Sequence, residues 1–368
     1  MPPRRLHRTF TSALSSQDNA LNLVRLTLAI LVIFGHVFSL AGLQTFEAGP
    51  LKHAGWHGAA VHGFFAISGF LILASAIKTP LAPYLWRRFL RIYPGYFVAI
   101  LAIAFLFAPL GALLDASVRW DGTAAVRFVI GSLDLRPSAY PVENAVPWQQ
   151  GWNGSLWTLF YEGVAYVGLG LATAIPWVRR NIRVLAPVIG VLGTIGYLGP
   201  SRARIATVLP DDLARIVHNG LELWTFFAWG MVAYVFADRL RPHLGWIAAS
   251  SGVALVALSV PAIPTRLSEL VLLPAITYTV LAAGALIPWR LGARNDISYG
   301  VYVYAFPVQQ ILVILGVGQF GWLVTALSCL VCTIPLAWAS WKLVEQPSMR
   351  LRRVVPSRRR AEPIPQSA

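Results

Sequence analysis

Charged residues are scarce in this chain. Only 12% of its 368 residues are Asp, Glu, Lys or Arg, whereas a soluble domain has about 25%. Cysteine is also rare. The two present, Cys329 and Cys332, are too few for a disulfide scaffold. They lie in an apolar segment without a histidine or a second cysteine pair nearby, so we expect no metal or redox site there.

Hydrophobic residues make up 57% of the chain, and its mean hydropathy is +0.62. Apolar runs of about 20 residues recur from end to end, long enough for helices that cross a membrane. The runs are continuous rather than alternating, which argues against strands. The sequence therefore predicts an all-α fold, a polytopic membrane bundle of about ten helices, at residues 21–43, 59–77, 92–114, 154–177, 184–199, 219–237, 244–262, 268–287, 297–316 and 320–341.

The formal net charge of +15 is distributed unevenly. With the N-terminus placed in the cytoplasm, 21 of the Lys and Arg residues lie in inside segments and 8 in outside segments. The positive-inside rule then predicts that both termini are cytoplasmic. We therefore attribute the positive charge to the orientation of the protein in the membrane and to contact with anionic membrane lipid, and not to a surface that binds nucleic acid. We expect a cytoplasmic segment 1–20, a transmembrane domain 21–344, and an Arg/Pro-rich tail 345–368 whose composition is typical of disorder.

Two ionisable residues share the first apolar segment. Arg25 and His36 are eleven residues apart, which places them on one face of a helix and roughly 16 Å apart along its axis. Ionisable side chains are costly inside a membrane and mark functional sites there. Each residue alone has an ordinary explanation, since Arg25 could reach to the interface and His36 could be a packing histidine. The aligned pair favours a functional site.

The second apolar segment contains a further imidazole, His62, and a serine, Ser68, in the run GAAVHGFFAISGFLI over 58–72. Small residues at this spacing permit close helix packing, and packing is the more ordinary interpretation. Direct participation of His62 or Ser68 in chemistry is the alternative.

Arg87, Arg88 and Arg91 precede the third segment. Arg88 and Arg91 are three residues apart and would share a helical face. Because arginine binds phosphate in a forked geometry, the cluster could be a cytoplasmic anion site. It could equally be a stop-transfer cluster, and composition alone leaves the two tied.

Glu162 is the carboxylate of the segment 153–162, which also holds Ser155 and Trp157. Inside a membrane a carboxylate needs a partner or a proton. His36 or an arginine is the natural partner, and the alternative is an ion pair that serves only helix packing. Near the C-terminal end, Asp296 is expected to cap a helix and Pro307 to kink it.

Taken in order, these segments resemble the membrane-bound acyltransferase-3 family. Its Arg-x10-His signature matches Arg25 and His36, and its Arg-x-x-Arg motif matches Arg88 and Arg91. The remaining matches are Phe64, Phe65, Ser68, Gly69 and Phe70 in the second span, Trp157, Thr158, Leu159 and Glu162 in the fourth, and Ser298, Tyr299, Glu345 and Pro347 near the end. Thr158 replaces the usual serine, and Tyr304-Ala305 precede Phe306-Pro307 where many members carry a histidine.

The resemblance implies an integral-membrane O-acyltransferase of the bacterial inner membrane. Such an enzyme would move an acyl group, by default acetyl, from acyl-CoA as co-substrate to a hydroxyl of a glycan or glycoside, without a metal. The roles implied are catalysis for His36, Glu162 and Arg25, and acyl-CoA binding for Arg25, Arg87, Arg88 and Arg91. The supporting residues implied are His62, Ser68, Ser155, Trp157, Tyr299 and Glu345. The alternative function, which belongs to the class of transporters, is a proton-coupled exporter of a glycan or an organic acid.

Overall fold

The chain is helical throughout the part described by the computed structural model, which comprises residues 9–14, 19–40, 55–137, 151–260, 262–289, 292 and 295–356. These residues include no strand, so the all-α prediction is confirmed. The α-helices are α1 (Phe10–Leu14), α2 (Leu21–Leu40), α3 (Trp56–Lys78), α4 (Leu81–Ala102), α5 (Ala108–Leu114), α6 (Gly122–Gly131), α7 (Thr158–Ala174), α8 (Pro176–Arg180), α9 (Ile182–Leu198), α10 (Arg202–Ile205), α11 (Asp211–Val235), α12 (Leu244–Ser259), α13 (Thr265–Leu286), α14 (Ser298–Ile314), α15 (Trp322–Ser340) and α16 (Gln346–Arg350).

Among the described residues, two π-helical turns interrupt the long helices. The first, η3 (Ile103–Phe107), joins α4 to α5, and the second, η5 (Trp341–Glu345), joins α15 to α16. The same residues include the short 3₁₀ turns η4 (Val317–Phe320) and η6 (Leu351–Arg353). Helical structure therefore extends past residue 344, the end of the transmembrane domain expected from the sequence.

Within the part of the chain that the structure describes, five helical stretches are long and apolar enough to cross a membrane: Leu21–Phe38, His57–Lys78, Leu81–Leu114, Arg266–Leu286 and Trp322–Arg353. Outward-facing apolar side chains on shorter helices, such as Val184, Leu192 and Ile195 of α9, also suit contact with lipid. The chain is thus a helical membrane protein, while the count of ten spans and the cytoplasmic position of both termini stay predictions.

The helix that contains the predicted third span, 92–114, begins before it, at Leu81, so the arginines that precede the span lie within α4. Arg88 and Arg91 are thus on one helix, as their spacing predicts. The side chain of Arg91 is only 19% exposed, because it faces a carboxylate inside the bundle.

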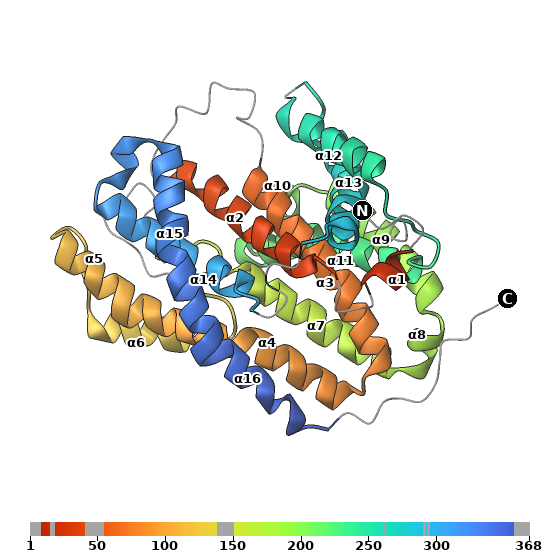
Figure 1. Ribbon diagram of the computed structural model, residues 1–368, viewed down its shortest axis with the longest axis horizontal. Coiled ribbons are helices and arrows are strands. Elements are labelled where there is room, and N and C mark those ends of the chain that lie inside the picture. The colour runs from red at the N-terminus through yellow and green to blue at the C-terminus, as the bar shows by residue number, and fades with distance from the viewer. Residues whose placement is uncertain are drawn as a thin grey trace.

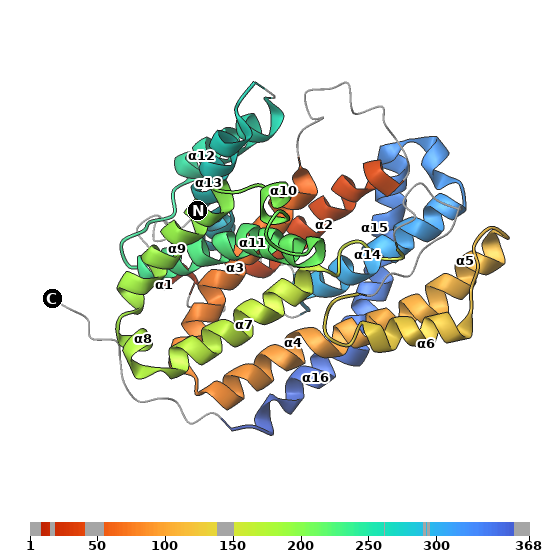
Figure 2. The same ribbon diagram turned by 180° about the vertical axis from the view of Figure 1, so that it is seen from behind.

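Helix α14 lies at the centre of the bundle, and nearly every residue from Ser298 to Leu312 is buried. It packs against α2 and α15. Figures 1 and 2 place α4 beside α7 at one edge of the bundle and α12 with α13 at the opposite edge. The central helix can therefore reach residues of both α2 and α4, which carry the arginines of interest.

Helices α3 and α11 cross in close backbone contact. A Cβ atom at Gly69 would collide with the carbonyl oxygen of Phe227, and one at Gly230 would collide with the carbonyl oxygen of Ala66. Glycine at the crossing lets the two backbones approach, as the small residues of segment 58–72 predict. The contact fixes α3, which carries His62 and Ser68.

Candidate active site

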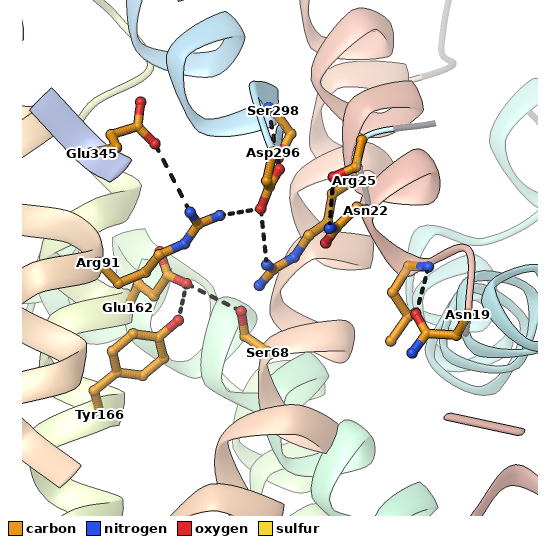
Figure 3. Close-up of polar contacts among 12 residues, drawn as sticks. Asn19, Asn22, Arg25, Ser68, Arg91, Glu162, Tyr166, Asp296, Ser298 and Glu345 are labelled. Atoms are coloured by element: carbon orange, nitrogen blue, oxygen red, sulfur yellow. Dashed lines mark hydrogen bonds and ion pairs between the residues drawn. The ribbon is translucent and has the colours of Figure 1, made fainter. Parts of the chain in front are cut away.

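A buried carboxylate joins two arginines from different helices (Figure 3). Asp296, immediately before α14, contacts Arg91 of α4 at 2.5 Å from Oδ2 to a guanidinium nitrogen. The same oxygen lies 3.9 Å from a guanidinium nitrogen of Arg25 on α2. Its other oxygen accepts hydrogen bonds from the Ser298 hydroxyl at 2.6 Å and the Ser298 backbone N–H at 3.3 Å. Asp296 thus contacts the first residue of α14 from the position before the N-cap residue, Ile297, and not as the N-cap expected from the sequence; it also binds the arginines.

Asp296 is ionised in this setting. Burial alone would raise the pKa of its carboxyl group, but the charges of Arg91 and Arg25 and the hydrogen bonds from Ser298 and Arg91 outweigh burial and lower the pKa. A carboxylate that stays negative holds two cationic side chains close together, which their mutual repulsion would otherwise oppose.

Glu345 and Tyr299 complete the surroundings of Arg91. Glu345 Oε2 lies 3.9 Å from a guanidinium nitrogen of Arg91, and Glu345 Oε1 accepts a hydrogen bond from the Ser340 hydroxyl at 3.1 Å. The Tyr299 hydroxyl donates to the backbone oxygen of Ile92 at 2.7 Å. The turn η5 and helix α14 therefore bring Glu345 and Tyr299, two of the family-motif residues near the C-terminal end, to the arginine cluster.

A pocket opens beside this cluster. Its polar lining comes from α2, α4, α7 and α14, and comprises Arg25, Arg91, Thr158, Glu162, Tyr166, Ser298, Tyr299 and Tyr302. Val61, Phe64 and Phe65 of α3 supply much of the apolar wall. The pocket can therefore hold a ligand that combines anionic groups with an apolar or extended portion.

Glu162 lies in the pocket, and its hydrogen-bond partners differ from those expected. It accepts hydrogen bonds from the Ser68 hydroxyl at 3.1 Å and from the Tyr166 hydroxyl, as Figure 3 shows. The expected pairing with His36 is absent among the described contacts. The reason is geometric, because the residue of this segment that reaches His36 is Ser155 in the turn before α7, whereas Glu162 lies within α7 and faces Ser68 and Tyr166.

Arg88 lies against aromatic rings. Its guanidinium carbon is 5.9 Å from the ring centroids of both Tyr84 and Tyr166, a favourable cation–π arrangement. It is also close enough to Arg25 and Arg91 to interact with them electrostatically. Arg25, Arg88 and Arg91 therefore form one positive region. Arg87, on the same helix, is half-buried.

His36 lies at the other end of α2 from Arg25, as predicted. Its Nε2 is 3.4 Å from the Ser155 hydroxyl. Its ring is edge-on to Phe306, with centroids 5.1 Å apart, and tilted against His57, with centroids 5.0 Å apart. The imidazole is thus held by a hydroxyl, a phenyl ring and a second imidazole.

Two other residues expected to support the site lie apart from it. His62 contacts Glu222 of α11, with Nε2 and Oε1 2.7 Å apart, and stacks on Phe226. Trp157 is 38% exposed and edge-on to Tyr161. Among the described residues, no group of three His, Cys, Asp or Glu side chains is arranged to hold a metal ion.

Comparison with known proteins identifies the family of the chain. A family model described as an acyltransferase domain matches residues 18–342. The chain belongs to the acyltransferase-3 family. It is therefore a membrane acyltransferase, and the arginine cluster and His36 both lie inside the matched domain.

Two relatives of this acyltransferase cover nearly its whole length. An O-acetyl transferase of Shigella phage Sf6 is 27% identical over 339 residues, which cover 90% of this chain and 96% of that protein. Nodulation protein 10 of Rhizobium leguminosarum bv. viciae is 27% identical over 377 aligned residues, which cover 94% of this chain and 97% of that protein. No solved structure matches the chain significantly.

Three residues of the acyltransferase make contacts that the sequence did not indicate: Asp296 as partner of the arginines, His57 beside His36 and, apart from the pocket, Glu222 beside His62. Glu222 lies inside the predicted span 219–237, so the rule that intramembrane charges are functional would have selected it. Asp296 resembled an ordinary cap, and His57 lies just outside the predicted span 59–77. Only the packing of α3 on α2 reveals the position of His57.

Proposed function

We propose that the protein is an O-acyltransferase of the bacterial inner membrane. It would move an acyl group, most simply acetyl, from cytoplasmic acyl-CoA to a hydroxyl of an extracytoplasmic or lipid-linked glycan. The observation that carries the proposal is the division of α2 into two sites. Its first turns hold Arg25 in a cationic cluster beside a pocket, and three turns later His36 offers an imidazole.

The cationic cluster fits the phosphates of coenzyme A. Guanidinium groups bind phosphate oxygens in pairs, and Arg25 and Arg91 line the pocket with Arg88 close behind. Arg25 and His36 are roughly 16 Å apart along the helix. The extended pantetheine arm has a length of that order, so phosphates at the arginines are compatible with a thioester near His36.

His36 would act as the general base. It takes the proton from the acceptor hydroxyl, the oxygen attacks the thioester carbonyl carbon, and the carbon–sulfur bond breaks to release the CoA thiolate. Ser155 orients the imidazole through its contact with Nε2. A transient acyl group on His36 is the alternative route. Glu162, Ser68 and Tyr166 lie in the donor part of the site, where they would position the bound acyl-CoA.

The acceptor is proposed on the family resemblance, and the donor group is supported by the name of a relative. The Shigella phage protein is called an O-acetyl transferase, which favours acetyl and an oxygen acceptor. The sequence motifs of this chain resemble a family whose members acylate bacterial polysaccharides and glycosides, which favours a glycan.

The test is release of free CoA by the purified protein in nanodiscs, with acetyl-CoA as donor and a panel of bacterial glycans as acceptors. We expect release in proportion to the acceptor, and its loss in a folded His36→Ala variant, because the general base is removed. His243→Ala is the matched control, since His243 only caps α12. Normal turnover by His36→Ala would refute the role of His36. Absence of CoA release with every acceptor would favour the proton-coupled exporter.

A further inference from the structure

His57 has a position that the proposed reaction does not yet use. It lies in the first turn of α3, and its ring is tilted by 33° against that of His36 with centroids 5.0 Å apart. His57 is exposed, whereas His36 is half-buried. An exposed imidazole therefore lies directly beside the imidazole assigned to proton removal.

The packing of α2 on α3 fixes this pair. A Cβ atom at Gly35 would lie 2.7 Å from Cβ of His57 and 3.1 Å from its Nδ1. Only a residue without a side chain permits His57 to approach the backbone of α2 so closely. The glycine immediately before His36 thus creates the space that His57 occupies.

A protonated His36 needs an outlet for its proton. Its described contacts are Ser155, Phe306 and His57, with no carboxylate among them. An imidazolium without a counter-charge is costly in a membrane interior. Glu162, which could have stabilised it, is bound to Ser68 and Tyr166 instead. His57 is the one basic group among these contacts.

We propose that His57 accepts the proton from His36 and delivers it to extracytoplasmic water. The proposal rests on the acyl transfer described above. The acceptor O–H bond breaks, the new C–O bond forms, and the C–S bond breaks. The acceptor proton moves from His36 to His57 and then to water, while the CoA thiolate takes a proton from water on the cytoplasmic side. A single bridging water can connect two rings at this spacing.

His62 and Glu222 form a second pair of titratable groups near His57. His57 interacts electrostatically with His62 of the same helix, and His62 in turn contacts Glu222 at 2.7 Å. A positive charge on His62 would oppose a proton on His57, and the Glu222 carboxylate of α11 balances that charge. The titratable groups that interact with His57 are therefore His36 from α2 and the His62 imidazole with its Glu222 counter-charge.

The test uses two variants of the full-length protein in nanodiscs, His57→Ala and His57→Phe, assayed for acetyl transfer with and without added imidazole. We expect both to lower kcat by about tenfold or more, which is modest for loss of a proton-transfer group, and to leave the KM for acetyl-CoA within about twofold. Imidazole should restore kcat in His57→Ala, where it can occupy the vacated space. It should not restore kcat in His57→Phe, where the ring fills that space.

The comparison separates proton transfer from packing. If His57 merely supports His36 sterically, His57→Phe keeps wild-type kcat, which overturns the proposal. Wild-type kcat in His57→Ala, or a loss that imidazole does not reverse, overturns it as well. The control His243→Ala reports any general effect of imidazole. An inactive wild type would refute the acyl transfer and the proton path together, whereas an active wild type with unaffected His57 variants refutes the proton path alone.

Discussion

Replacement of Asp296 by asparagine should destabilise the bundle strongly. The substitution keeps the shape of the side chain and an oxygen that can cap Ser298, but it removes the negative charge between Arg25 and Arg91. Removal of one partner from a buried ion pair costs about 3–5 kcal/mol. The Asp296 side chain is only 11% exposed. We therefore expect the free energy of unfolding to fall by about 3–5 kcal/mol at neutral pH.

The chain offers a matched control on its surface. Asp134 and Arg136 are also 2.5 Å apart, but their side chains are 46% and 56% exposed. An exposed pair contributes about 0–1 kcal/mol, so Asp134→Asn should unfold almost like the wild type. Both variants can be compared by denaturant titration in one detergent. Equal, small losses in the two variants would refute the role of burial and charge at Asp296.

The effect of Asp296 should depend on pH with a definite sign. Because its pKa is lowered in the folded protein, its stabilisation is present above the pKa of an unfolded aspartate, about 4, and disappears as the pH falls through the lower folded value. The difference in unfolding free energy between wild type and Asp296→Asn should thus be constant near neutral pH and shrink below about pH 4. A difference that grows on acidification would contradict this assignment.

Two further predictions concern packing and the imidazole. Gly230→Ala should destabilise the protein by about 1–3 kcal/mol, because the added methyl group would meet the backbone of Ala66, and Gly252→Ala, where nothing lies within 4 Å, is the control in the same thermal-unfolding assay. Ser155→Ala should lower kcat about two- to tenfold without changing the KM for acetyl-CoA, because it removes one hydrogen bond to His36; unchanged kcat would show that Ser155 does not orient the imidazole.

The helical membrane bundle and the Arg25–His36 relationship were predictable because both depend on one helix. Continuous apolar runs specify membrane helices, and an eleven-residue separation fixes the relative direction of two side chains on any helix. The burial of Arg91 was not predictable from hydropathy, because its carboxylate partner, Asp296, comes from a distant part of the chain.

The partners of Glu162 and His36 could not be read from the sequence for a different reason. Each partner comes from another helix, and the rotation and depth of one helix relative to another depend on packing. Ser155 rather than Glu162 lies beside His36 because of how the turn before α7 packs against α2. The same holds for Asp296, whose contacts with Arg25 and Arg91 come from two other helices.

The π-helical turn η5 determines which way Glu345 points. In a regular α-helix, residues five apart point about 140° away from each other. Ser340 and Glu345 are five apart, yet their side chains are hydrogen-bonded at 3.1 Å. The wider turn, with its hydrogen bonds between residues five apart, brings both onto one face. The additional residue in this turn thus places the Glu345 carboxylate in the interior, beside Ser340 and Arg91, while α15 before it and α16 after it are α-helices.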